Sequence, residues 1–198
     1  HSISRGQVLS RPYTFEEGRL IVREMTELLS LDLVEKRIVT NQLELTLGYD
    51  TEGIPDNYKG EITSDRYGRK IPKQAHGTIN LDGYTSSTKK IMSAMTELFD
   101  RIVDPELSVR RMYVVANRVI SENMVDNEPV QLDFFTDPEE TERKRAAEKE
   151  AAGKERSLQE TMLGIMHKFG KNAILKGMNL QDGATTVERN GQVGGHKA

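Results

Sequence analysis

The sequence predicts an α+β fold: a four-stranded, mainly antiparallel sheet with two helices on one face, followed by a C-terminal helical tail. Three observations support this fold class. Apolar residues alternate strictly over residues 42–49, as in a strand with one buried face. They recur at helical spacing over residues 15–36 and 88–103. Beyond residue 137 the chain is rich in Glu, Lys, Arg and Ala, which predicts a solvated helix or a disordered segment.

The first strand and first helix are predicted over residues 2–10 and 15–36. Ile3 and Val8 are the apolar residues expected to anchor the strand. Thr14 and Glu17 form a capping box, in which each side chain bonds the other residue's backbone N–H. The helix places Ile21, Met25, Leu28 and Leu29 in the core, and we expect Arg19, Arg23, Glu24 and Glu27 to point to water.

Two further strands and a long connection follow. The strand over residues 42–49 buries Leu43, Leu45, Leu47 and Tyr49. Residues 50–72 form a Gly- and charge-rich connection, which is either mobile or extends the hairpin as a functional lobe. The third strand is predicted from about residue 73 to residue 81.

The second helix and last strand complete a βαββαβ order. Ser86, Ser87 or Thr88 caps a helix whose core stripe is Ile91, Met92, Met95, Leu98 and Phe99. The strand over residues 109–120 turns Met112, Val114 and Ala116 inward. Two helices cover one side of such a sheet, so we expect the other side to be bare.

The tail is predicted as two helical segments. Pro138 suits a first helical position, and a second capping box of Ser157 and Glu160 starts an amphipathic helix that Gly170 ends. The predicted division is a domain over residues 1–122, a linker over 123–136 and a charged helical tail over 137–198.

Composition narrows the function classes. The chain has no cysteine, which excludes disulfides and thiolate metal sites and predicts a cytoplasmic protein in a reducing compartment. Apolar runs fall short of the roughly 18 residues of a membrane span, so no membrane partner is expected. The first residue, His1, suggests a piece of a longer protein. The net charge of −3 argues against a uniformly basic nucleic-acid binder, although basic residues outnumber acidic ones over residues 66–118.

Catalytic residues are not apparent. The four histidines stand neither beside a nucleophile nor at metal-ligand spacing, and no phosphate-binding Gly-rich loop occurs. We therefore predict no catalytic residue and no metal site in this chain.

The bare sheet face is the predicted binding surface. It collects hydroxyls, amides and cations that suit a phosphate backbone, namely Ser4, Gln74, His76, Thr78, Arg111 and Asn117. Arg5, Arg110 and Arg111 would supply charge, with Lys73 and the loop of Tyr67, Arg69 and Lys70 at the margin. The alternative is that these residues only keep an open face soluble.

The linker carries a short motif, Gln131, Leu132, Asp133, Phe134 and Phe135. An amide followed by isolated apolar residues resembles the peptides by which bacterial DNA polymerases bind the sliding clamp. The alternative is an edge strand that packs on its own domain.

The order of these elements resembles the little finger domain of Y-family DNA polymerases, with Ser4 and Arg5, then Ala75, His76, Gly77 and Thr78, then Arg110 and Arg111 in matching places. The nearest likeness is to the UmuC/ImpB/MucB/SamB-like translesion polymerases of Gram-positive bacteria. It implies that these residues grip the backbones of double-stranded primer-template DNA. It also implies that the catalytic domains, which would use Mg, precede His1, leaving no cofactor here. The 50–72 connection is longer than the family's usual hairpin.

Two functions are therefore expected from the sequence. The first is the DNA-gripping and clamp-docking part of an error-prone repair polymerase of the SOS response to damaged DNA. The alternative is a protein-protein interaction module of a DNA repair or SOS regulatory protein without direct DNA contact.

Overall fold

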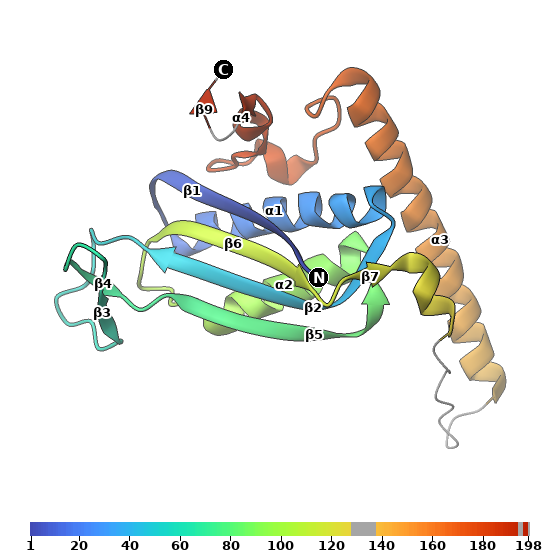
Figure 1. Cartoon of the computed structure of the whole chain (residues 1–198), viewed down its shortest axis with the longest axis horizontal. Helices are drawn as coiled ribbons and strands as arrows, with labels where there is room; N and C mark the ends of the chain where they lie inside the picture. Colours follow the sequence, from blue (N-terminus) through green and yellow to red (C-terminus); the bar gives the residue numbers. More distant parts are fainter. Residues whose placement is uncertain (128–137, 194–195, 198) are drawn as a thin grey trace.

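A computed structural model describes residues 1–127, 138–193 and 196–197 of the chain. Its sheet consists of β1 (Ile3–Tyr13), β6 (Val109–Asn117), β2 (Ile38–Tyr49) and β5 (Ala75–Thr85), antiparallel and in that spatial order. The helices α1 (Phe15–Glu35) and α2 (Thr88–Ile102) lie on the same face of the sheet (Figure 1). The predicted fold class is confirmed.

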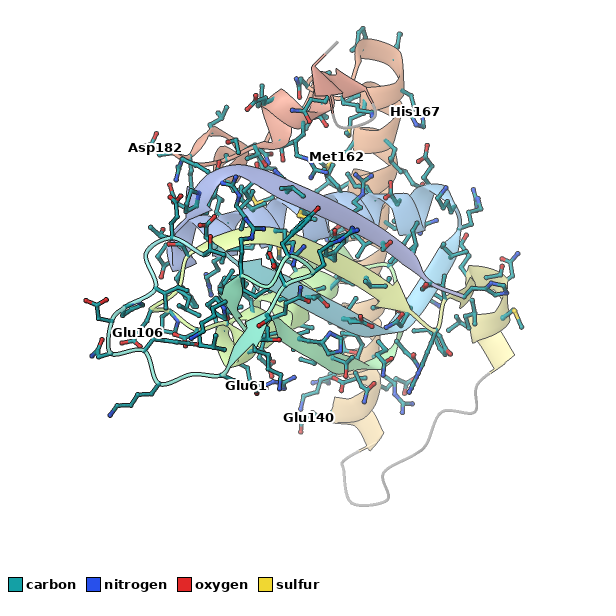
Figure 2. The ribbon with its side chains drawn as sticks, turned by 60° about the vertical axis from the view of Figure 1, so that its left-hand side comes forward. Glu61, Glu106, Glu140, Met162, His167 and Asp182 are labelled. Carbon is teal, nitrogen blue, oxygen red and sulfur yellow. The ribbon has the colours of Figure 1, made fainter. Side chains whose placement is uncertain are left out.

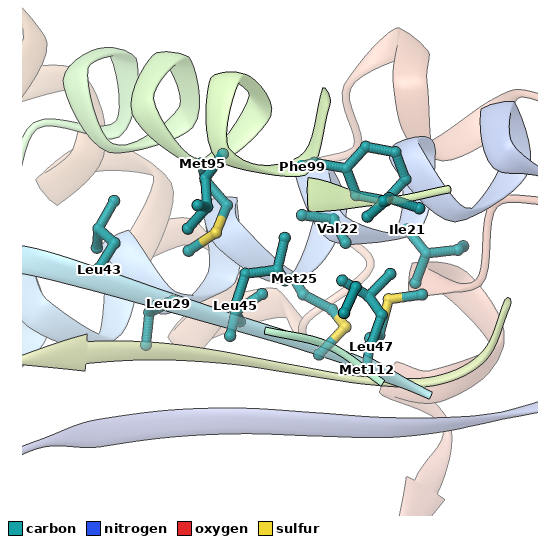
Figure 3. Close-up of a cluster of buried hydrophobic side chains, with 14 of the residues drawn as sticks. Ile21, Val22, Met25, Leu29, Leu43, Leu45, Leu47, Met95, Phe99 and Met112 are labelled. Carbon is teal, nitrogen blue, oxygen red and sulfur yellow. The ribbon is translucent and has the colours of Figure 1, made fainter. Parts of the chain in front are cut away.

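The core lies between this sheet face and the two helices. Leu43, Leu45 and Leu47 of β2 are fully buried, as their alternation predicts. The predicted helical stripes pack against them (Figure 3), and the fully buried members are Ile21, Met25, Leu29, Ile91, Met95, Leu98 and Phe99. Apolar burial on this one face therefore fixes which side of each strand remains for solvent.

Both helix starts follow the predicted capping chemistry. The Thr14 hydroxyl accepts from the Glu17 backbone N–H at 3.3 Å, and the Thr14 N–H donates to the Glu17 carboxylate at 2.9 Å. Arg11 also donates to that carboxylate, and this bond is the main reason why the pKa of Glu17 falls to about 2. Ser87 caps α2 by accepting from the Lys90 N–H at 3.2 Å.

The edges of the sheet differ from the prediction. β1 continues through Arg11 and Pro12 to Tyr13, and its buried apolar residues are Leu9 and Tyr13. Val8 is 68% exposed, so its predicted role as an anchor is wrong. β6 ends at Asn117, and a short strand β7 (Ile120–Ser121) then pairs with the start of β2.

Part of the long 50–72 connection is an ordered hairpin of β3 (Ile62–Ser64) and β4 (Lys70–Pro72). It projects from one end of the sheet, beyond the C-terminal end of β2 (Figure 1). Of the two predicted alternatives, the structure favours a lobe that extends the hairpin.

The tail begins with one continuous helix, α3 (Pro138–Phe169), which follows the 3₁₀ turn η1 (Glu122–Asn127) in the described chain. The predicted helix start at Ser157 is wrong, because Ser157 lies within α3 and its carbonyl accepts from the Thr161 hydroxyl. Ion pairs at i,i+4 spacing, including Glu150 with Lys154, extend the helix through the polar stretch. Gly170, at φ 96°, ends the helix as predicted.

The remaining tail folds back onto α1 and the edge strand β1. It contains η2 (Gly177–Leu180), α4 (Thr186–Asn190) and the pair β8 (Gln192–Val193) and β9 (His196–Lys197). Glu24 and Glu27 of α1 are 2% and 5% exposed beneath it, so the prediction that they face water is wrong. Among the described helices, none combines the length and apolar character of a membrane span.

Candidate nucleic-acid interface

The sheet face opposite α1 and α2 carries four rows of side chains, each row crossing neighbouring strands. The pairing register brings residues of β1, β6, β2 and β5 into line. The rows are Val8, Arg111 and Gly48; Gly6, Tyr113, Thr46 and His76; Ser4, Val115, Glu44 and Thr78; and Asn117, Gln42 and Asn80. The face therefore presents mostly hydroxyls, amides and rings.

The tail residues that the structure describes, 138–193 and 196–197, leave this face uncovered. Their contacts go to α1, to the start of α2 and to the edge of β1 on the helix side (Figures 1 and 2). At the β1 edge, Arg189 donates to the Gly6 carbonyl at 3.1 Å and to Gln7 at 2.9 Å. Tyr113, in the middle of the open face, stays 46% exposed.

Two glycines keep the face flat. A Cβ added at Gly6 would stand 2.6 Å from the Tyr113 ring, and one added at Gly48 would stand 2.4 Å from Arg111 Nε. A real Cβ atom could not stand so close to another atom. The absence of a Cβ at these glycines therefore lets the Tyr113 and Arg111 side chains lie flat across the neighbouring strands. The two side chains therefore lie close over β1 and β2, and the face has little relief.

The charges on the four rows are few. Arg111 is their single arginine or lysine, and Glu44 is their single carboxylate. Asn117 donates to Glu44 at 2.9 Å, while His76 Nδ1 lies 2.9 Å from the Thr46 hydroxyl and 3.9 Å from Glu44. Glu44 was not among the predicted site residues, although its place between Leu43 and Leu45 puts it on the solvent-facing side of β2.

The structure brings together five of the residues predicted for this face: Ser4, His76, Thr78, Arg111 and Asn117. Gln74 is exposed two residues before His76, directly ahead of β5.

The other predicted basic residues lie elsewhere. Arg5 points to the helix side, where it donates two bonds to Asp32, at 2.6 and 2.7 Å; its expected place on the open face is wrong. Arg110 approaches Asp50 at 3.5 Å, and Lys73 pairs with Glu61 at 2.7 Å. Arg110 and Lys73 therefore lie at the end of the sheet that carries the β3–β4 hairpin.

The motif Gln131, Leu132, Asp133, Phe134 and Phe135 lies outside the described residues. Within the described part of the chain, no three His, Asp or Glu side chains gather in a group that could hold a metal ion.

Comparison with known proteins identifies the family. None of the curated protein sequences matches this chain. One similar solved structure is a complex of the beta-clamp processivity factor and the little finger domain of PolIV. It shares 9% identity and a TM-score of 0.41, over 69% of this chain and 100% of that one. The family model described as the impB/mucB/samB family C-terminal domain matches residues 1–134. The chain therefore belongs to this family, the little finger domains of Y-family DNA polymerases, as its sequence resemblance predicts.

Proposed function

We propose that this chain holds primer-template DNA with the open sheet face and docks its parent polymerase on the sliding clamp during translesion synthesis. The observation that carries the DNA part is the uncovered face itself, with its rows of hydrogen-bonding side chains across four strands. Membership of the little finger family supports the same assignment. The Gram-positive type, the cytoplasmic location and the division at residues 122 and 136 stay predictions.

The composition of the face suits contacts to a backbone rather than to bases. Ser4, Thr78 and Asn80 can donate to phosphate oxygens, and Arg111 supplies charge. Glu44 opposes phosphate, although Asn117 already occupies one of its oxygens. We therefore expect this chain alone to bind DNA modestly and in a salt-sensitive way. Most of the DNA affinity of the parent polymerase would come from combining this face with contacts made by its other domains.

Replacing Arg111 by alanine tests the grip. Each phosphate contact contributes about 0.9 to the slope of log affinity against log salt, so the slope should fall by about that amount. The measurement is fluorescence anisotropy of a labelled blunt duplex between 50 and 200 mM salt, a range typical for such titrations. Lys149→Ala, at an exposed position of α3, is the matched control and should leave the slope unchanged. An unaltered slope for Arg111→Ala would remove this residue from the interface.

The clamp part of the proposal rests on the linker motif. Burying Leu132 and a phenylalanine contributes roughly 2 kcal/mol each, which after ordering costs corresponds to an affinity on the order of micromolar. Changing Leu132 and Phe134 together to alanine should abolish calorimetric binding of the chain to a bacterial sliding clamp. Phe169→Ala, at a 67% exposed position, should bind normally. Unchanged clamp binding by the double variant would mean that the motif has a structural role and does not contact the clamp.

A protein-protein interaction module remains a second candidate because Val8 and Tyr113 are exposed apolar side chains on the same face. This alternative gains support if the chain shows no salt-dependent DNA affinity but captures a repair protein through Val8. DNA binding that depends on Arg111 contradicts it.

A further inference from the structure

The tip of the β3–β4 hairpin presents an aromatic ring to solvent between two arginines. Tyr67 is 73% exposed. The guanidinium carbons of Arg66 and Arg69 lie 5.4 and 5.6 Å from its ring centroid, within the range of cation–π attraction. An exposed ring flanked by two guanidinium groups is a surface on which a flat, anionic ligand such as a nucleotide can stack.

The turn that carries Tyr67 is held in one conformation. The Asp65 carboxylate accepts from the backbone N–H of Tyr67 at 2.8 Å and of Arg69 at 2.9 Å, and from Arg69 Nε at 2.7 Å. These bonds, the Arg69 N–H first among them, hold the pKa of Asp65 below its ordinary value. Gly68 supplies the positive φ, 77°, that the turn requires. The ring is therefore presented by an organised turn.

The charge around the ring is positive in an acidic chain. Residues 59–73 contain five lysines and arginines against two carboxylates, whereas the whole chain has a net charge of −3. Glu61 and Asp65 pair with Lys73 and Arg69. For Arg66, Lys70 and Lys59, the described residues provide no carboxylate partner, so these cations are available to an anionic ligand.

The hairpin continues the end of the open face that carries Arg111. Ala75, the first residue of β5, pairs with Leu47, and the next residue of β2, Gly48, pairs with Arg111. Figure 2 brings this end forward, with Glu61 marking the hairpin. A nucleic acid lying on the open face therefore reaches the hairpin by continuing past the end of the sheet.

We propose that the hairpin tip is a second DNA contact that binds unpaired nucleotides, with a base stacked on the Tyr67 ring and phosphates on Arg66 and Lys70. Bases within a duplex expose only their edges, so a ring can stack only on a base without a paired neighbour above it. A base that replaces Arg66 over the ring frees that guanidinium for a phosphate. This inference rests on the proposed DNA function and adds the single-stranded part of the substrate.

A fluorescence experiment tests the stacking directly, because the chain contains no tryptophan. In Tyr67→Trp, oligothymidine should quench the single tryptophan, and added salt should reverse the quenching. Phe169→Trp is the matched control: that site is 67% exposed and has the Lys168 ammonium 5.2 Å from the ring, but it lies at the end of α3. Quenching in both variants, or in neither, would overturn the proposal.

An affinity experiment separates this inference from the proposed function. Tyr67→Ala should weaken binding to a duplex with a 5′ single-stranded overhang by about tenfold and leave a blunt duplex unaffected. Equal losses on both DNAs would show a duplex contact instead, and no loss would remove the ring from the interface. If the chain fails to bind the blunt duplex while the overhang still requires Tyr67, the open-face proposal fails and the hairpin proposal stands.

Discussion

Replacing Phe99 by alanine should destabilise the domain by about 4 kcal/mol, because large-to-small changes of a buried phenylalanine cost about 3–5 kcal/mol. The Phe99 side chain is fully buried, and its ring centroid lies 4.9 Å from that of Phe15 at the start of α1. The cavity would open between both helices and the sheet, where the surrounding residues belong to three different elements and cannot close in together.

Thermal unfolding followed by circular dichroism measures this effect. For a chain of this size, about 4 kcal/mol corresponds to a fall of about 10 °C in Tm. Phe169→Ala is the same chemical change at a 67% exposed position and should shift Tm little. Equal shifts in the two variants would contradict the packing described for the core.

Replacing Glu24 by alanine should weaken the attachment of the tail to α1 and cost about 2–3 kcal/mol. The Glu24 carboxylate is buried and accepts from the Asn179 side-chain amide and from the Thr185 backbone N–H, both at 2.8 Å. Truncation leaves those two donors unpaired, and an unsatisfied buried donor costs about 1–3 kcal/mol. The neighbouring ion pair of Lys176 with Glu27 would remain, but the hydrogen bonds of Glu24 to Asn179 and Thr185 would be lost.

Amide hydrogen exchange provides a direct readout, since the Thr185 N–H is itself one of the released donors. Its exchange should accelerate by at least tenfold in Glu24→Ala, while amides of β2 keep their protection. Glu97→Ala, at an exposed position of α2, should change neither. Unchanged exchange at Thr185 would show that contacts other than Glu24 hold the tail.

Local patterns predicted most of the sheet and its two helices. The alternation of Leu43, Leu45 and Leu47 defines the buried face of β2, and the Thr14 and Glu17 box marks where α1 begins. Such signals work because both partners of the interaction lie within a few residues. The same logic gave the wrong helix start at Ser157, where i,i+4 ion pairs prolong one helix through a polar stretch.

Contacts between distant segments could not be read from the sequence. Glu24 looks like a solvated helix residue until Asn179, 155 positions later, covers it. Arg5 looks like a DNA ligand, but its register in β1 turns it toward Asp32. The predicted face residues that did come together, such as His76 and Arg111, each stand next to a buried apolar residue, Ala75 and Met112 respectively.

Gly6 and Gly48 have a mechanical consequence for any long, stiff partner. Because the Tyr113 and Arg111 side chains lie against the sheet, the open face has little relief. A stiff partner that slides along this face therefore meets few steric barriers. A bulky residue at either glycine would displace Tyr113 or Arg111 outward and create such a barrier. Such a variant could still bind a stationary partner, but the partner would slide along the face more slowly.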